Sequence, residues 1–168
     1  ALSAEDTGNY SVAVGYRALQ QQDNNDNNYN IAVGADAGRS INSGIYNVVI
    51  GGLAGDALTS CTRNVAIGLN ALGSEDTGSH NVAIGHGALK TADAGADAYN
   101  VAIGSSAGTA VTTGTLNTIV GGLAGDALTT GDSNVAIGYA AMGAADGSES
   151  RNVAIGYAAL ATMNNDAS

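Results

Sequence analysis

The sequence contains no proline, phenylalanine or tryptophan, and only 4% of its residues are aromatic. A globular core in a chain of 168 residues ordinarily uses aromatic rings, because each ring buries a large area. Hydrophobic residues still make up 45% of the chain, and they are mainly alanine, valine, isoleucine and leucine. The interior must therefore be built from small side chains.

Other absences exclude whole classes of protein. A single cysteine excludes an internal disulfide. With 15 acidic and 5 basic residues, the net charge of −10 argues against binding to nucleic acid or to anionic membranes. No apolar run reaches the roughly 18 residues that a membrane helix needs, so we expect no membrane insertion. The chain opens with neither a methionine nor a signal peptide, so we expect a processed chain or an excised fragment.

A short repeat fills the whole sequence. Its unit reads Asn-Val-Ala-Ile-Gly, and successive copies are 17 to 19 residues apart. The nine glycines that end the copies are Gly15, Gly34, Gly51, Gly68, Gly85, Gly104, Gly121, Gly138 and Gly156. Asparagine opens eight copies, and Ser11 opens the first. These asparagines are Asn30, Asn47, Asn64, Asn81, Asn100, Asn117, Asn134 and Asn152.

A longer period is superimposed on the short one. Gly51 and Gly121 are 70 residues apart, and the segment Gly-Gly-Leu-Ala-Gly-Asp-Ala-Leu follows the same spacing at 51–58 and 121–128. Alanine lies three residues after the glycine in every copy, followed by either a large apolar residue or another glycine. Where a glycine follows, an apolar residue comes three places later, as Leu58 does after Gly55. We interpret this as one core position filled by two routes.

A short strand recurring every 17 to 19 residues predicts an all-β parallel β-solenoid, one domain over 1–168, with nine coils and a four-coil superrepeat of about 70 residues. The alternation in Val-Ala-Ile places valine and isoleucine on one face, which we expect to form the dry interior. The glycine allows a positive φ at the corner of the coil, and the asparagines stack into a structural ladder. The alanine column is either a tight sheet contact or a seam between chains. In the Ala-Gly-Asp-Ala-Leu stretch, a single helical turn stays a possible alternative.

The segment Asn-Val-Ala-Ile-Gly-Tyr-Ala-Ala-Leu at 152–160 resembles the repeats of phage tail-fibre and tail-spike regions. More distantly, it resembles the head repeats of trimeric autotransporter adhesins, which are shorter. The resemblance implies a left-handed parallel β-roll that trimerises about the fibre axis. It also implies a structural and adhesive role on a virion tail fibre, or outside the cell at its surface. A cell-surface glycan or receptor would be the partner, through residues that the resemblance does not identify.

The sequence alone also favours self-association, because a 17-residue coil encloses only a thin core and neither end carries a capping helix. We expect a homo-oligomer within a longer fibre, which the resemblance specifies as a homotrimer. The alternative is a single-chain solenoid that stacks end to end into an extracellular filament. The absence of a recurring threonine column argues against ice binding.

The sequence offers little support for an enzymatic function, and we expect neither catalytic activity nor a bound cofactor. His80 and His86, the two histidines, lie in one coil where other coils carry tyrosine, and a metal pair would need a third ligand that the sequence does not indicate. Glycosidase chemistry needs two carboxylates at a set separation, and the acidic residues are spread over many turns. Cys61 aligns with Gly131 one superrepeat later, so we expect a free cysteine in a turn.

Two further kinds of ligand have candidate residues in the sequence, namely calcium ions and sugars. The segment 51–58 nearly matches a calcium-binding nonapeptide, but Ala54 stands where glycine is required. A calcium-dependent β-roll is therefore the less favoured alternative for the whole chain, with Asp56 and Asp126 as weak calcium candidates. We favour a turn-capping role for both. The seven tyrosines flank the strands, where they either cover the core, form a seam between chains or stack on sugars.

Overall fold

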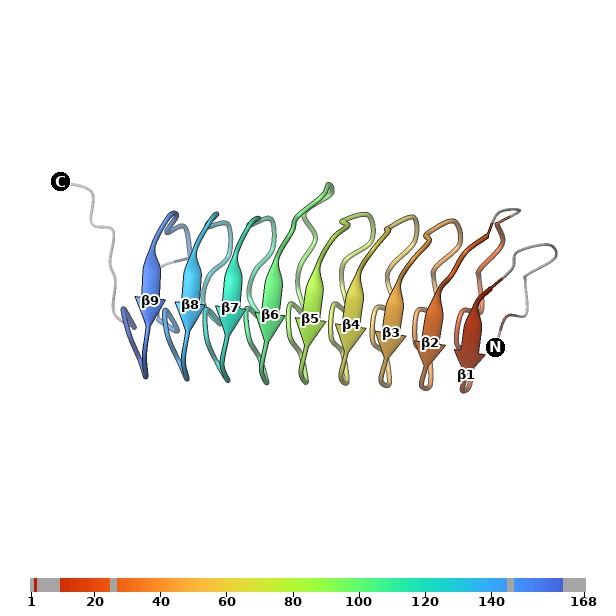
Figure 1. The fold of residues 1–168 in the computed structure, drawn as a ribbon, viewed down its shortest axis with the longest axis horizontal. Coiled ribbons are helices and arrows are strands. Elements are labelled where there is room, and N and C mark those ends of the chain that lie inside the picture. Colours follow the sequence, from red (N-terminus) through yellow and green to blue (C-terminus); the bar gives the residue numbers. More distant parts are fainter. Residues whose placement is uncertain (1, 3–9, 25–26, 145–146, 162–168) are drawn as a thin grey trace.

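The computed structural model describes residues 2, 10–24, 27–144 and 147–161. Nine strands follow one another along a rod in sequence order, each paired in parallel with the next (Figure 1). They are β1 (Val12–Val14), β2 (Ile31–Val33), β3 (Val48–Ile50), β4 (Val65–Ile67), β5 (Val82–Ile84), β6 (Val101–Ile103), β7 (Thr118–Val120), β8 (Val135–Ile137) and β9 (Val153–Ile155). The described residues contain no helix, so the helical turn left open above does not form. The predicted all-β parallel solenoid is confirmed.

Each coil, or rung, begins with a strand that pairs in register with the next rung. Val65 lies opposite Val82, and Ile67 lies opposite Ile84. The pairing extends past the strand, because the N–H of Val65 donates to the carbonyl of Asn81 at 2.8 Å. The β-branched residues favour this extended conformation, and the stacking spacing of about 4.7–4.9 Å gives a rod of roughly 40 Å.

The glycine that follows each strand makes the corner of the rung. Gly51 has a φ of 133°, a conformation that side chains rarely adopt. A Cβ atom there would lie 2.6 Å from the backbone oxygen of Gly68 in the next rung. Both the conformation and the close stacking therefore require glycine at this corner.

The prediction that valine and isoleucine form the dry interior is wrong. In β4, the central Ala66 is fully buried, whereas Val65 and Ile67 on either side point outward and remain partly exposed. The interior is narrow, and large side chains from the far side of the rung already fill it. Only a small residue fits the central strand position in most rungs; Val49 and Ile119 are the larger exceptions.

The core position with two routes is confirmed. Leu72, directly after the alanine, and Leu58, three residues after Gly55, are both fully buried. A Cβ on Gly55 would lie 2.6 Å from Leu58 Cδ1, so the delayed leucine occupies the space that a side chain at 55 would take. The alanine column faces this core. Eight of its members are fully buried within their own chain. It is therefore an interior contact and not a seam between chains.

Candidate functional site

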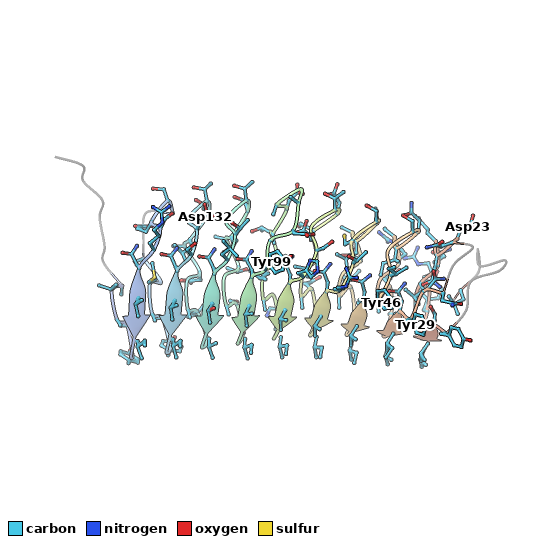
Figure 2. The ribbon with its side chains drawn as sticks, turned by 45° about the horizontal axis from the view of Figure 1, so that its top comes forward. Asp23, Tyr29, Tyr46, Tyr99 and Asp132 are labelled. Atoms are coloured by element: carbon cyan, nitrogen blue, oxygen red, sulfur yellow. The ribbon has the colours of Figure 1, made fainter. Side chains whose placement is uncertain are left out.

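One surface of the rod carries most of the exposed apolar side chains. We call it the strand face: in each rung, it runs from the residue before the asparagine column, through the outward strand residues, to the residue after the glycine. Among the described residues, every exposed large hydrophobic side chain lies on the strand face except Leu53, Leu123 and Leu160. Figure 2 shows Tyr29, Tyr46 and Tyr99 beside the starts of their strands.

Acidic residues are distributed in the opposite way to the apolar ones, because they avoid the strand face. None of the chain's 15 acidic residues falls within the strand-face stretches. Two of the five basic residues do, Arg63 and Arg151, together with both histidines. Exposed acidic residues such as Asp23 and Asp132 lie instead on the loop edge, away from the strands (Figure 2). The strand face is therefore free of carboxylates in every rung, and all the acidic residues lie outside it.

The asparagine column lies inside the rod and ties the rungs together. Asn64 is fully buried, its Oδ1 accepts the N–H of Asn81 at 2.8 Å, and its Nδ2 donates to the carbonyl of Gly78 at 2.9 Å. The same Oδ1 bond links consecutive asparagines from Asn30 to Asn152. The asparagine side chains form hydrogen bonds to backbone groups and to one another, so the role of this column is structural.

The tyrosines before the asparagine column stack on one another. Tyr29 lies 5.0 Å from Tyr10 and 5.5 Å from Tyr46, measured between ring centroids, with interplanar angles of 8° and 12°. The Arg63 guanidinium then lies 5.6 Å from the centroid of the Tyr46 ring. Sugars stack on ring faces, and here the faces between neighbouring rungs are covered. The exposed ring edges make this ladder a poor platform for sugar stacking.

The two histidines lie at opposite ends of β5. His80 stacks on Tyr99 with a centroid distance of 4.6 Å, and its Nδ1 is 3.4 Å from Asp97 Oδ1. His86 follows the strand and is exposed. The described part of the chain does not group them into a metal-ligand cluster.

Neither calcium candidate lies in a cluster of carboxylates, although Asp56 shares Arg39 with Asp36. Asp56 Oδ2 is 3.7 Å from the Arg39 guanidinium, a cation that competes with a metal. Burial raises the pKa of Asp56, and Arg39 opposes that rise; burial also raises the pKa of Asp126. Neither joins a metal-ligand group within the described residues.

A different acidic group does assemble. Glu75, Asp76 and Asp93 bring carboxylate oxygens within 4.8 Å of one another. Glu75 is fully buried, and its Oε1 accepts the N–H of Gly78 at 2.7 Å. Desolvation by burial raises the pKa of Glu75. Sequence reasoning missed this group, although the 17-residue separation of Asp76 and Asp93, one rung, was the signal.

Cys61 is free, as expected, but it is buried and not exposed in its turn. Its Sγ donates to the carbonyl of Asp76 at 2.8 Å. Burial raises the pKa of the thiol to about 11, so it is a weak nucleophile near neutral pH.

The comparisons with known proteins add no relative: no protein-family profile, curated protein or solved structure matches the chain. Nor does any helix in the described ranges have the length and apolar character to cross a bilayer. The strand face is thus the feature on which a functional argument can rest.

Proposed function

We propose that this chain is a structural and adhesive fibre segment, a shaft of the phage tail-fibre or adhesin-like kind, that works as a homotrimer. The observation that carries the proposal is the strand face. Val65 and Ile67, with their counterparts in the other rungs, form two outward rows of β-branched side chains along the rod. A contiguous exposed apolar surface of this kind is typical of an interaction site.

Charge supports self-association through this face. Copies of a chain with a net charge of −10 repel one another, and the carboxylates lie outside the strand face. Packing strand face against strand face separates those carboxylates and buries the apolar rows. The acidic loop edges would then form the outer surface, where they keep the rod soluble and could meet a cell-surface glycan or receptor.

The test uses lysines placed on one side or the other of the rod. In the variant Val65→Lys/Ile67→Lys, two charges interrupt the strand face, and we expect the trimer to dissociate in size-exclusion chromatography with light scattering. Ala96→Lys puts one charge on the exposed loop edge and serves as the control. Equal behaviour of the two variants would contradict the proposal.

The open edges of β1 and β9 support a second candidate, a single-chain filament. Each of these two strands pairs with a neighbour on one side only within the described residues. Unpaired strand edges are templates for another chain. Electron microscopy separates the candidates, because short discrete rods favour the trimeric shaft and long uniform fibres favour end-to-end stacking. Binding of the chain to an array of surface glycans tests the adhesive part.

A further inference from the structure

The strand face has two margins, one at each end of its strands. The start margin is the residue before the asparagine column, and the end margin is the residue after the glycine. From the first rung to the last, the start margin reads Tyr10, Tyr29, Tyr46, Arg63, His80, Tyr99, Leu116, Ser133 and Arg151. The end margin reads Tyr16, Ala35, Gly52, Leu69, His86, Ser105, Gly122, Tyr139 and Tyr157.

Residue size at the two margins is complementary within most rungs. A large start residue faces a small end residue in four of them: Tyr29 with Ala35, Tyr46 with Gly52, Tyr99 with Ser105, and Leu116 with Gly122. The order is reversed in the eighth rung, which pairs Ser133 with Tyr139. Five of the nine rungs therefore pair a large margin residue with a small one, and no rung carries a small residue at both margins.

A single chain does not explain this relationship. The margins of one rung are separated by the strand, on the order of 15–20 Å. Gly52 and Gly122 do not have the positive φ of the corner glycines. A Cβ at either position would meet its nearest neighbour at 3.4 or 3.5 Å, which is ordinary contact. The fold of the chain thus requires glycine at neither position.

A closed ring of copies does explain it. When three rods turn their strand faces toward a common axis, the start margin of each meets the end margin of the next. Rotation about an axis along the rod produces no shift in height, so each rung meets the same rung of its neighbour. In five of the rungs, the residues that meet are the ones whose sizes complement each other.

We propose that the two margins form the seam between adjacent copies of this chain in a parallel, cyclic trimer, with Tyr46 of one copy over Gly52 of the next. This inference rests on the proposed function and specifies its interface. The other four rungs place a large residue at both margins: Tyr10 with Tyr16, Arg63 with Leu69, His80 with His86, and Arg151 with Tyr157, the last as a cation over a ring. One superrepeat after Tyr10 and Tyr16, both positions become histidine together, His80 and His86.

Paired cysteines test the seam. In a Cys61→Ser background, whose serine hydroxyl can replace the thiol as a donor, the variant Tyr46→Cys/Gly52→Cys places one cysteine on each margin of the third rung. Oxidation is followed by non-reducing electrophoresis, and sedimentation of the reduced protein measures assembly independently. The mismatched control is Tyr46→Cys/Gly122→Cys, whose cysteines lie four rungs apart, about 19 Å along the rod. The variant Leu116→Cys/Gly122→Cys repeats the test in the seventh rung.

We expect both matched pairs to form covalent trimers. The mismatched pair and the single variants Tyr46→Cys and Gly52→Cys, made in the same background, should remain largely uncrosslinked. A trimer by sedimentation in which matched pairs crosslink no faster than the control would overturn the seam and leave the trimeric proposal standing. Covalent dimers without trimers would indicate a two-fold face-to-face contact and overturn the seam as well. A monomer by sedimentation in the unsubstituted chain would overturn the proposed function itself.

Discussion

The side-chain oxygen of Asn64 lies 2.8 Å from the backbone nitrogen of Asn81 and accepts its N–H one rung away. Asn64 Nδ2 also donates to the carbonyl of Gly78, whereas the buried Nδ2 of Asn81 has no acceptor among the described groups. Replacing Asn64 with alanine therefore leaves two buried backbone groups unsatisfied, while replacing Asn81 leaves only the N–H of Asn100.

We expect Asn64→Ala to lower the free energy of unfolding by about 2–4 kcal/mol and Asn81→Ala by roughly half as much. Urea denaturation of both variants measures the difference. A loss at Asn81 equal to that at Asn64 would show that the side-chain donor of Asn64 contributes nothing.

Because two sequence positions can fill the same core space, a leucine at position 55 should restore the stability that is lost when Leu58 is removed. Leu58→Ala should cost about 2–5 kcal/mol, because it empties the interior of its rung. Gly55→Leu should also destabilise, since the new side chain meets Leu58. Gly55 has a φ of 49° and Leu72 has a φ of 52°, so leucine tolerates this backbone. The double variant Gly55→Leu/Leu58→Ala should recover to within about 1.5 kcal/mol of the parent chain. A thermodynamic cycle measures the coupling, and additive losses would contradict the shared position.

Adjacent glycines give opposite expectations at the end of β3. Gly51→Ala places a side chain at a φ of 133° against the next rung, and we expect a loss of about 3 kcal/mol or more. Within its own chain, Gly52→Ala meets ordinary space and should cost the rod less than about 0.5 kcal/mol, so any larger loss in the assembled trimer would come from the seam with Tyr46. Thermal unfolding compares the two, and comparable losses would show that the corner places no special demand on residue 51.

Stability should depend on pH through Glu75. Burial raises its pKa above the ordinary value of 4.5, helped by the charges of Asp93 and Asp76 and opposed by the N–H groups of Gly78 and Ala94. The folded chain therefore holds this proton at a higher pH than the unfolded chain does. Stability falls as pH rises from about 4.5 through the raised pKa, because the folded chain then has to ionise a buried carboxyl. Below about 4.5, Glu75 is protonated in both states, so its full contribution to stability is present and no longer changes with pH.

Glu75→Gln should remove the part of this decline that Glu75 causes, leaving the parts due to Asp56 and Asp126, whose pKa values are also raised. It should raise the unfolding free energy at pH 7, because the amide oxygen can still accept from Gly78. Chemical denaturation at a series of pH values measures it, with the exposed Asp23→Asn as control. A Glu75→Gln variant less stable at pH 7 than the parent would show that the charged carboxylate is well accommodated.

The repeat predicted the fold well because its signals are local. The glycine column required a corner, the asparagines a ladder, and the spacing of Gly55 and Leu58 a shared core position. Alternation in Val-Ala-Ile distinguished two faces of the strand without saying which faces inward, because both are apolar. Burial in the folded rung decides that question: in the fourth rung Leu72 and Ala66 are fully buried, whereas Val65 and Ile67 remain partly exposed.

The acidic group at Glu75 was harder to predict because its members come from two rungs and the sequence does not place their oxygens. The strand face had a signal that could have been read, since no acidic residue occurs within those stretches. Recognising it as a surface required knowing that Val65 and Ile67 point outward.

The claim that the strand face joins copies of this chain is tested most directly by sedimentation equilibrium of the unsubstituted chain at micromolar concentration. The mass of one chain is 16.4 kDa. We predict a single species of three times that mass across the concentration series. A stable species with the mass of one chain, its apolar rows open to water, would contradict the account.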